Sequence, residues 1–154
     1  IVYKCINERL CSICGNPLKN DMWMIGGPLS TFHPHGVFVD SPVHYDCGKY
    51  ALQVCPYLAF SIYKAKTDAS KIDGEKFDNH EFVNPTQSKE RVPFFCFTKI
   101  SDFTVRQPNP VERFIIPVKP YLQIEYWNDG QIISEDEVIR LLREHQTQLL
   151  NSNQ

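Results

Sequence analysis

The sequence predicts an α+β fold, because it combines cysteine- and histidine-bearing motifs, a series of short apolar strands and a capped helix near its C-terminal end. Its 154 residues and 42% apolar content are enough for one domain with a hydrophobic core. Lys and Arg total 16 against 18 Asp and Glu, so the net charge of -2 gives no basic excess for nucleic acid. No apolar run reaches the ~20 residues of a membrane span, and no signal peptide is recognised.

The N-terminal third of the sequence predicts a turn followed by a β-hairpin. Residues 9–16, "RLCSICGN", form a tight cysteine-bearing turn in which Gly15 suits a positive φ angle. The apolar segments 22–25, "MWMI", and 36–40, "GVFVD", predict two strands, and a Gly-Gly-Pro run ends the first of them. The two strands are expected to pair as a hairpin with a long connection.

A helix is predicted to follow the hairpin. Ser41 favours the N-cap position, and Pro42 suits the first helical position, where its missing N–H costs nothing. Pro56 disfavours helical geometry in the residue before it, so the helix is expected to end near Cys55. Apolar residues recur at steps of three and four, which predicts that one stripe of this helix faces the core: Val43, Cys47, Tyr50, Ala51, Val54 and Leu58.

The second half of the sequence predicts strands and a final helix. Residues 64–91 are polar without periodicity and predict a long surface loop with an internal boundary. After it, four segments rich in Phe, Ile, Val and Tyr predict strands, with prolines between them: 93–100, 102–107, 111–118 and 121–127. Residues 128–131, "NDGQ", predict a turn. Ser134 and Glu137 form the capping box of a helix whose apolar side is Val138, Leu141, Leu142 and Leu149.

Two short motifs predict a metal site. Cys11 and Cys14 form a C-x-x-C turn, in which two sulfur atoms can converge on one ion at ~2.3 Å. His44 and Cys47 lie three residues apart in the first turn of the predicted helix, and this spacing puts both on one face. Four such ligands in two close pairs are typical of a structural zinc site. Because all four positions are filled by protein side chains, no position is left for water or substrate.

Other interpretations of the cysteines stay open. Cys55 competes with His44 for the fourth position, although eight residues of continuous helix would place it ~12 Å from Cys47 along the axis. A helix that breaks at Gly48 would remove that objection. A disulfide framework or unrelated free thiols are the remaining alternatives. Cys96 lies in an aromatic strand and is expected to be a buried thiol of the core.

The predicted architecture is a single domain over residues 1–154. A treble-clef-like zinc finger, made of the knuckle, the β-hairpin and the helix, is expected over 5–60. A small antiparallel strand-rich part with the C-terminal helix is expected to pack on it over 61–154. Structural zinc sites contribute on the order of 10 kcal/mol to folding, so zinc is expected to order the N-terminal part.

The first functional hypothesis is a zinc-stabilised binding or regulatory module that acts through protein contacts. Its 12% aromatic content and near-neutral charge suit a protein surface better than DNA. The first alternative is a nucleic-acid-binding finger, with Arg140, Arg143, Lys64 and Lys66 as candidate contacts.

The second alternative is a metal-dependent nuclease of the His-Me (HNH) type. Its candidate residues are His33 and His35 in "TFHPHG", since an imidazole near a metal-bearing helix can act as a general base. Such an enzyme needs catalytic ligands on the helix, where His44 is already assigned to zinc, and usually carries more positive charge. No catalytic residue is therefore assigned, and a solvent-exposed loop is the simpler interpretation of these histidines.

Four stretches carry a resemblance to a known family: "ERLCSICGNPL", "IGGP", "SPVHYDCGKYALQVCPYL" and "EYWNDGQIISEDEV". They resemble uncharacterised small bacterial and phage proteins with an R-L-C-x-x-C-G motif, an H-x-x-C motif and a C-terminal E-W-W-x-x-G segment. The resemblance implies a zinc finger and a bacterial cytoplasmic or phage setting. An accessory role in a phage or mobile element, modulating host or defence proteins, belongs to the first functional hypothesis. Here "EYW" stands in place of the tryptophan pair, and "STFHPHG" has no counterpart, which weakens the nuclease alternative.

Overall fold

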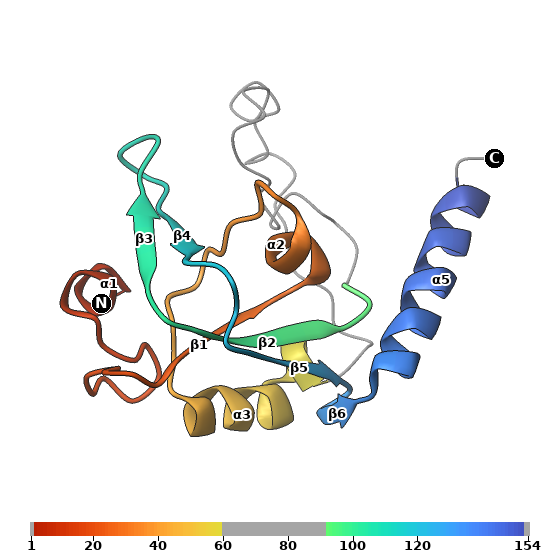
Figure 1. The fold of residues 1–154 in the computed structure, drawn as a ribbon, viewed down its shortest axis with the longest axis horizontal. Coiled ribbons are helices and arrows are strands. Elements are labelled where there is room, and N and C mark those ends of the chain that lie inside the picture. The colour runs from red at the N-terminus through yellow and green to blue at the C-terminus, as the bar shows by residue number, and fades with distance from the viewer. Residues whose placement is uncertain (1, 60–91, 153–154) are drawn as a thin grey trace.

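The computed structural model describes residues 2–59 and 92–152 of the chain (Figure 1). The predicted loop at 64–91 and the expected boundary between 60 and 61 lie outside the described residues. The helices are α1 (Val2–Glu8), α2 (Pro28–Phe32), α3 (Tyr45–Val54), α4 (Pro56–Ala59) and α5 (Glu135–Ser152). The strands are β1 (Met22–Gly26), β2 (Phe95–Ile100), β3 (Phe103–Arg106), β4 (Phe114–Pro117), β5 (Gln123–Asn128) and β6 (Gln131–Ile133).

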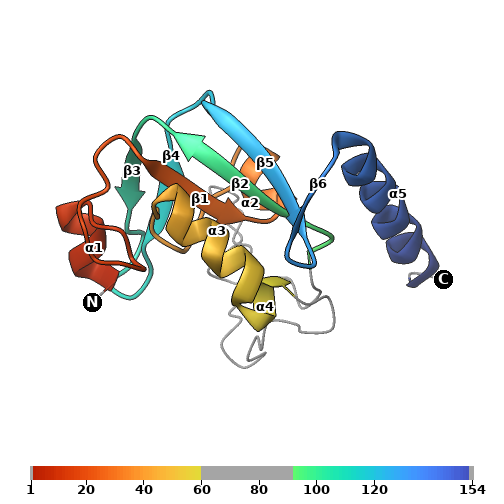
Figure 2. The ribbon, with the colours of Figure 1, turned by 90° about the horizontal axis from the view of Figure 1, so that it is seen from below.

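An antiparallel sheet forms the centre of the fold, so the α+β class is confirmed. Its strand order is β1-β2-β5-β6, and β3 pairs with β4 in a separate two-stranded sheet. The helix α3 covers one face of the larger sheet and α2 lies on the other (Figures 1 and 2). The central strand β2 is therefore almost wholly buried, with only Lys99 partly exposed. A strand covered on both faces favours apolar residues on both sides, which Phe95, Cys96 and Phe97 provide.

The predicted hairpin between 22–25 and 36–40 is wrong. The strand β1 forms as expected, but it pairs with β2, with Met24 opposite Thr98. The predicted second strand contributes only isolated bridge positions, such as Phe38 opposite Ile115, and α2 fills the connection. The buried strand β2 offers five paired positions to β1, so this pairing supplies ladder hydrogen bonds together with apolar burial.

The predicted helix starts three residues later than expected. Val43 exchanges two backbone hydrogen bonds with Trp23 at 2.8 and 2.9 Å, which holds it extended at the outer edge of β1. His44, and not Ser41, is the N-cap of α3. The Tyr45 N–H donates to the Asp21 carboxylate at 3.3 Å, so an anion from outside the helix caps it. The helix ends at Val54, close to the predicted end.

The expected apolar stripe is right at Cys47 and Leu58, which pack against the core, and wrong at Tyr50 and Val54. Tyr50 is 63% exposed and Val54 is 49% exposed, whereas the buried residues of the helix are Gly48 and Leu52. A Cβ at Gly48 would lie 2.6 Å from the Phe97 ring. The absence of a side chain therefore lets α3 approach the aromatic centre of the sheet, and periodicity of large residues alone does not reveal this contact.

We expect Gly48→Ala to destabilise the protein by about 1–2 kcal/mol. The added methyl group must displace the Phe97 ring, and overpacking of this kind costs more than the ~1 kcal/mol that alanine gains in a helix. Urea denaturation followed by tryptophan fluorescence measures the change. Equal or higher stability of the variant would show that the ring moves without strain.

The C-terminal half follows the sequence prediction more closely. The strands β2, β3 and β4 lie within the predicted segments, and β5 extends one residue beyond its segment, to Asn128. Asp129 and Gly130 have φ angles of 51° and 77°, as a two-residue hairpin turn requires, and this turn adds the unpredicted strand β6. The Glu137 N–H donates to the Ser134 hydroxyl oxygen at 3.2 Å, which confirms the predicted cap of α5. This helix packs on the sheet through Val138, and its later turns point away from it (Figure 2).

Candidate metal centre

The first pair of candidate ligands projects from a backbone turn that closes on itself. Leu10 and Pro17 form an antiparallel bridge at the base of the turn. The Cys11 N–H donates to the Asn16 carbonyl at 2.8 Å, and the Gly15 N–H donates to the Cys11 carbonyl at 2.8 Å. Gly15 has a φ angle of 79°, in the region that glycine enters without strain. We refer to residues 10–17 as the knuckle.

We expect Gly15→Ala to cost about 1 kcal/mol and to weaken metal binding. No atom lies within 4 Å of a Cβ placed there, so the cost arises from the left-handed backbone and not from a clash. Gly15→Asn is the matched control, because asparagine tolerates this conformation better. Competition with a chromogenic chelator measures metal affinity, and an alanine variant that binds as tightly as the asparagine variant would contradict the backbone argument.

The short helix α1, which the sequence analysis missed, contacts the knuckle through Cys5. The Leu10 N–H donates to the carbonyl of Cys5, at 2.8 Å, and the buried Cys5 thiol lies 4.0 Å from the Cys11 carbonyl oxygen. Next to this helix, Arg9 pairs with Asp102 at 2.6 Å, and its guanidinium lies 4.5 Å from the centroid of the Phe103 ring. The knuckle is therefore attached to β3, a part of the chain far away in sequence.

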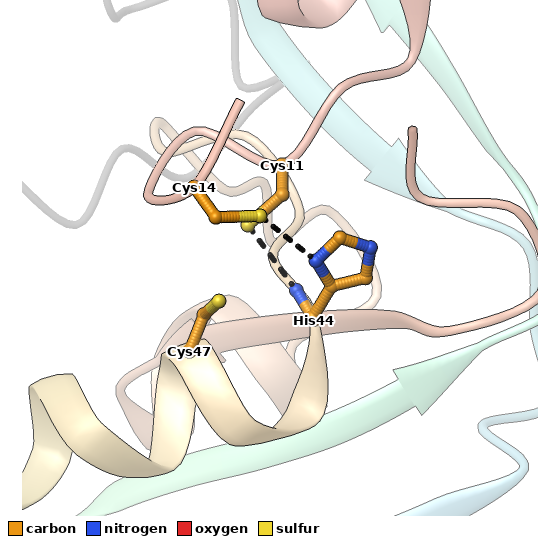
Figure 3. A group of neighbouring side chains, drawn as sticks. All are labelled: Cys11, Cys14, His44 and Cys47. Atoms are coloured by element: carbon orange, nitrogen blue, oxygen red, sulfur yellow. Dashed lines mark hydrogen bonds between the residues drawn. The ribbon is translucent and has the colours of Figure 1, made fainter. Parts of the chain in front are cut away.

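The second pair of candidate ligands lies at the start of α3. His44 is the N-cap residue and Cys47 lies in the first turn, so both side chains reach the knuckle (Figure 3). The ligand atoms of Cys11, Cys14, His44 and Cys47 all lie within 4.8 Å of one another. The structure thus brings together the four residues that the sequence analysis selected, and this group could hold a metal ion.

The spacing and the chemistry of the group both fit a tetrahedral ion. Bonds of ~2.3 Å from a tetrahedral centre place the ligands about 3.8 Å apart, and the observed limit of 4.8 Å requires only small side-chain movements. Cys11 is fully buried, Cys14 is exposed, and the other two ligands are intermediate. The site therefore lies at the surface, and its Cys11 side belongs to the core.

The hydrogen bonds of His44 orient its ring for coordination. Its Nε2 lies 2.9 Å from the Pro17 carbonyl, which can only accept, so we assign the proton to Nε2. The lone pair of Nδ1 then points toward the cluster, where Cys14 Sγ lies 3.3 Å away. Such a carbonyl partner is what fixes the tautomer of metal-binding histidines. The His44 backbone N–H also lies 3.5 Å from Cys11 Sγ.

The thiols of the cluster differ in their tendency to ionise. A hydrogen bond from the Asn16 backbone lowers the pKa of Cys14 to about 7, and the neighbouring Cys11, His44 and Cys47 side chains act in the same direction. Burial and the adjacent Cys11 and Cys14 sulfurs raise the pKa of Cys47 to about 12. Several thiolates at this distance repel one another, so a cation is what allows them to ionise together.

The remaining cysteines do not belong to this cluster. All six cysteines belong to the described residues, and all are free thiols, which excludes the disulfide alternative in this structure. Cys55 is the C-cap of an unbroken α3, so the structure gives the fourth position to His44. Cys96 is buried in the core as expected, and burial raises its pKa to about 12.

The candidate residues of the two alternative functions are not gathered into a site. His33 and His35 follow α2, on the sheet face opposite α3, and neither belongs to a metal-ligating group within 2–59 and 92–152. Arg140 pairs with Glu137 and Glu144 along α5. Lys64 and Lys66 lie outside the described residues. The sequence analysis missed two groups that support the site. The Asp21 carboxylate accepts from the Tyr45 N–H, and the Pro17 carbonyl accepts from the His44 ring. No sequence motif indicates either contact.

Comparison of the chain with protein-family models, with curated proteins and with solved structures found no match. The resemblance to bacterial and phage proteins therefore stays a prediction. Within the part of the chain that the structure describes, no helix has the length and apolar character to cross a membrane.

Proposed function

We propose that Cys11, Cys14, His44 and Cys47 hold one structural zinc ion, and that the chain is a zinc-stabilised module acting through protein contacts. The observation that carries the proposal is the convergence of three sulfurs and one imidazole nitrogen within 4.8 Å. Zinc favours this donor set in tetrahedral geometry. With four protein ligands the site is closed, which favours a structural role over catalysis.

The zinc ion would join two segments that are distant along the chain. Cys14 and His44 are 30 residues apart, and the strand β1 runs between the two ligand pairs. A knuckle, a strand and a helix whose start carries the second pair give this part a treble-clef-like plan, although β1 takes its partner from β2. When bound, the ion supplies folding free energy, while the chain orients His44 and caps α3.

Exposed apolar side chains on the knuckle and on α3 support a role in protein binding. Ile13, at the tip of the knuckle, is 49% exposed, and Tyr50 and Val54 on α3 are exposed to a similar or greater extent. Side chains of this kind contribute to protein interfaces more than to DNA contacts. An accessory role in a phage or mobile element, modulating host or defence proteins, is part of this proposal.

Metal analysis of the purified chain tests the zinc proposal. We expect one zinc per chain, its loss in Cys47→Ser, and its retention in Cys55→Ser, which changes a cysteine on the same helix that is no ligand. If the chain is purified under reducing conditions and contains no zinc, the proposal is disproved. Zinc that remains in Cys47→Ser would place the ion elsewhere.

A DNA-binding assay at two salt concentrations tests the mode of action. We expect no measurable binding at low salt, because the chain has a net charge of -2 and Arg140 is paired with carboxylates. Binding that weakens steeply as the salt concentration rises would favour the nucleic-acid-binding alternative.

A further inference from the structure

We propose that the same cluster is a peroxide-sensitive switch, in which oxidation joins Cys11 to Cys14 and releases the knuckle from α3. This inference rests on the proposed function, since the reduced state is the zinc-bound state. It concerns regulation of the site and adds a chemical step that a purely structural site does not have.

The arrangement of the three sulfurs makes the cluster able to form a disulfide. Their Sγ atoms belong to a group of ligand atoms within 4.8 Å of one another, so any two approach without unfolding the chain. Only Cys14 is exposed, whereas Cys11 is fully buried and Cys47 is intermediate. A small oxidant from solvent therefore meets Cys14 first.

The partner of Cys14 follows from the local geometry. Cys11 lies three residues away in the same hydrogen-bonded turn, so the bond between them requires no movement of α3. Cys47 belongs to a helix that Leu52 and Gly48 fix against the sheet, and its reaction with Cys14 would have to pull two separate segments together. The reaction within the knuckle is therefore expected to be faster.

The reaction with hydrogen peroxide balances in two steps. The Cys14 thiolate attacks one peroxide oxygen, the O–O bond breaks, and Cys14 sulfenic acid and one hydroxide form. The Cys11 thiolate then attacks the Cys14 sulfur, the S–O bond breaks, the S–S bond forms and a second hydroxide leaves. The two thiolates lose two electrons, the peroxide gains them, and two protons convert the hydroxides to water.

The disulfide changes what holds the two segments together. Both of its sulfurs belong to the knuckle, so the bond does not extend to α3. Only His44 and Cys47 remain as ligands, and two ligands are too few for a structural zinc site. The exposed Ile13 belongs to the part of the chain that loses this attachment, and the buried Leu18 follows directly after it. Because the ion is released, oxidation is expected to have the same effect on the fold as removal of the metal by a chelator.

Treatment of the zinc-loaded full chain with hydrogen peroxide tests the switch. We expect release of one zinc per chain, detected with a chromogenic chelator, and a Cys11–Cys14 disulfide mapped by mass spectrometry after alkylation. Reduction with dithiothreitol and added zinc should restore the bound state. Cys55→Ser is the matched control and should release zinc at the unchanged rate, because this residue lies outside the cluster.

Two results would overturn the switch. One is a zinc-loaded chain that keeps its zinc and its reduced thiols in peroxide, and the other is a bridge from Cys47, which would keep the knuckle on α3. A chain that never binds zinc disproves the proposed function instead. The disulfide map of that chain still shows whether Cys11 and Cys14 react with each other, so the two failures are distinguishable.

Discussion

Removal of the metal is expected to abolish the cooperative thermal unfolding transition of the protein. A structural site of this type contributes on the order of 10 kcal/mol, and the total stability of a domain is only about 5–15 kcal/mol. The ligand Cys11 is itself part of the main core cluster, together with Leu18 and Trp23, so loss of the ion affects packing as well as coordination. Cys11→Ser and Cys47→Ser should have the same effect as a chelator.

Calorimetry and near-UV circular dichroism measure this change, since Trp23 is a buried residue of β1 in the same core cluster as Cys11. The chelated protein should regain its transition when zinc is added back. Cys55→Ser serves as the matched thiol control and should unfold within a few degrees of the parent. A chain that is shown to be metal-free and still melts at the original temperature would remove the ion from the stability of the fold.

The site was more predictable from the sequence than the sheet was. The spacing of Cys11 and Cys14 and that of His44 and Cys47 describe short-range geometry, which a turn and one helical turn fix almost alone. The cap at Ser134 and the turn at Gly130 were predicted for the same reason. Local patterns determine local structure wherever few conformations satisfy them.

The errors concern contacts between distant segments. Nothing in the sequence near Met24 indicates that its strand pairs with Thr98 and not with the next apolar segment. The helix α3 starts later than predicted because Val43 pairs with Trp23, which is again a long-range contact. The role of Gly48 is likewise visible only when the Phe97 ring is in place. Strand pairing depends on which segments share a core, and periodicity does not contain that information.

The core residue with the largest expected effect is Phe97. It is fully buried, and its ring packs against Trp23 at a centroid distance of 4.7 Å and against Tyr45 at 5.4 Å. We expect Phe97→Ala to cost about 3–5 kcal/mol and to lower the melting temperature by roughly 10 °C or more. The higher part of this range applies, because the rigid aromatic neighbours and Gly48 offer no flexible side chain to fill the cavity.

Phe32→Ala is the matched control, since this phenylalanine on α2 is 50% exposed and should cost well under 1 kcal/mol in the same urea titration. Phe97 also supports the helix that carries Cys47, so the variant should release its metal to a chelator faster than the parent does. If Phe97→Ala and Phe32→Ala lose equal amounts of unfolding free energy, the aromatic cluster does not anchor α3. Faster unfolding with unchanged metal release would mean that the knuckle holds its ligands independently of the sheet.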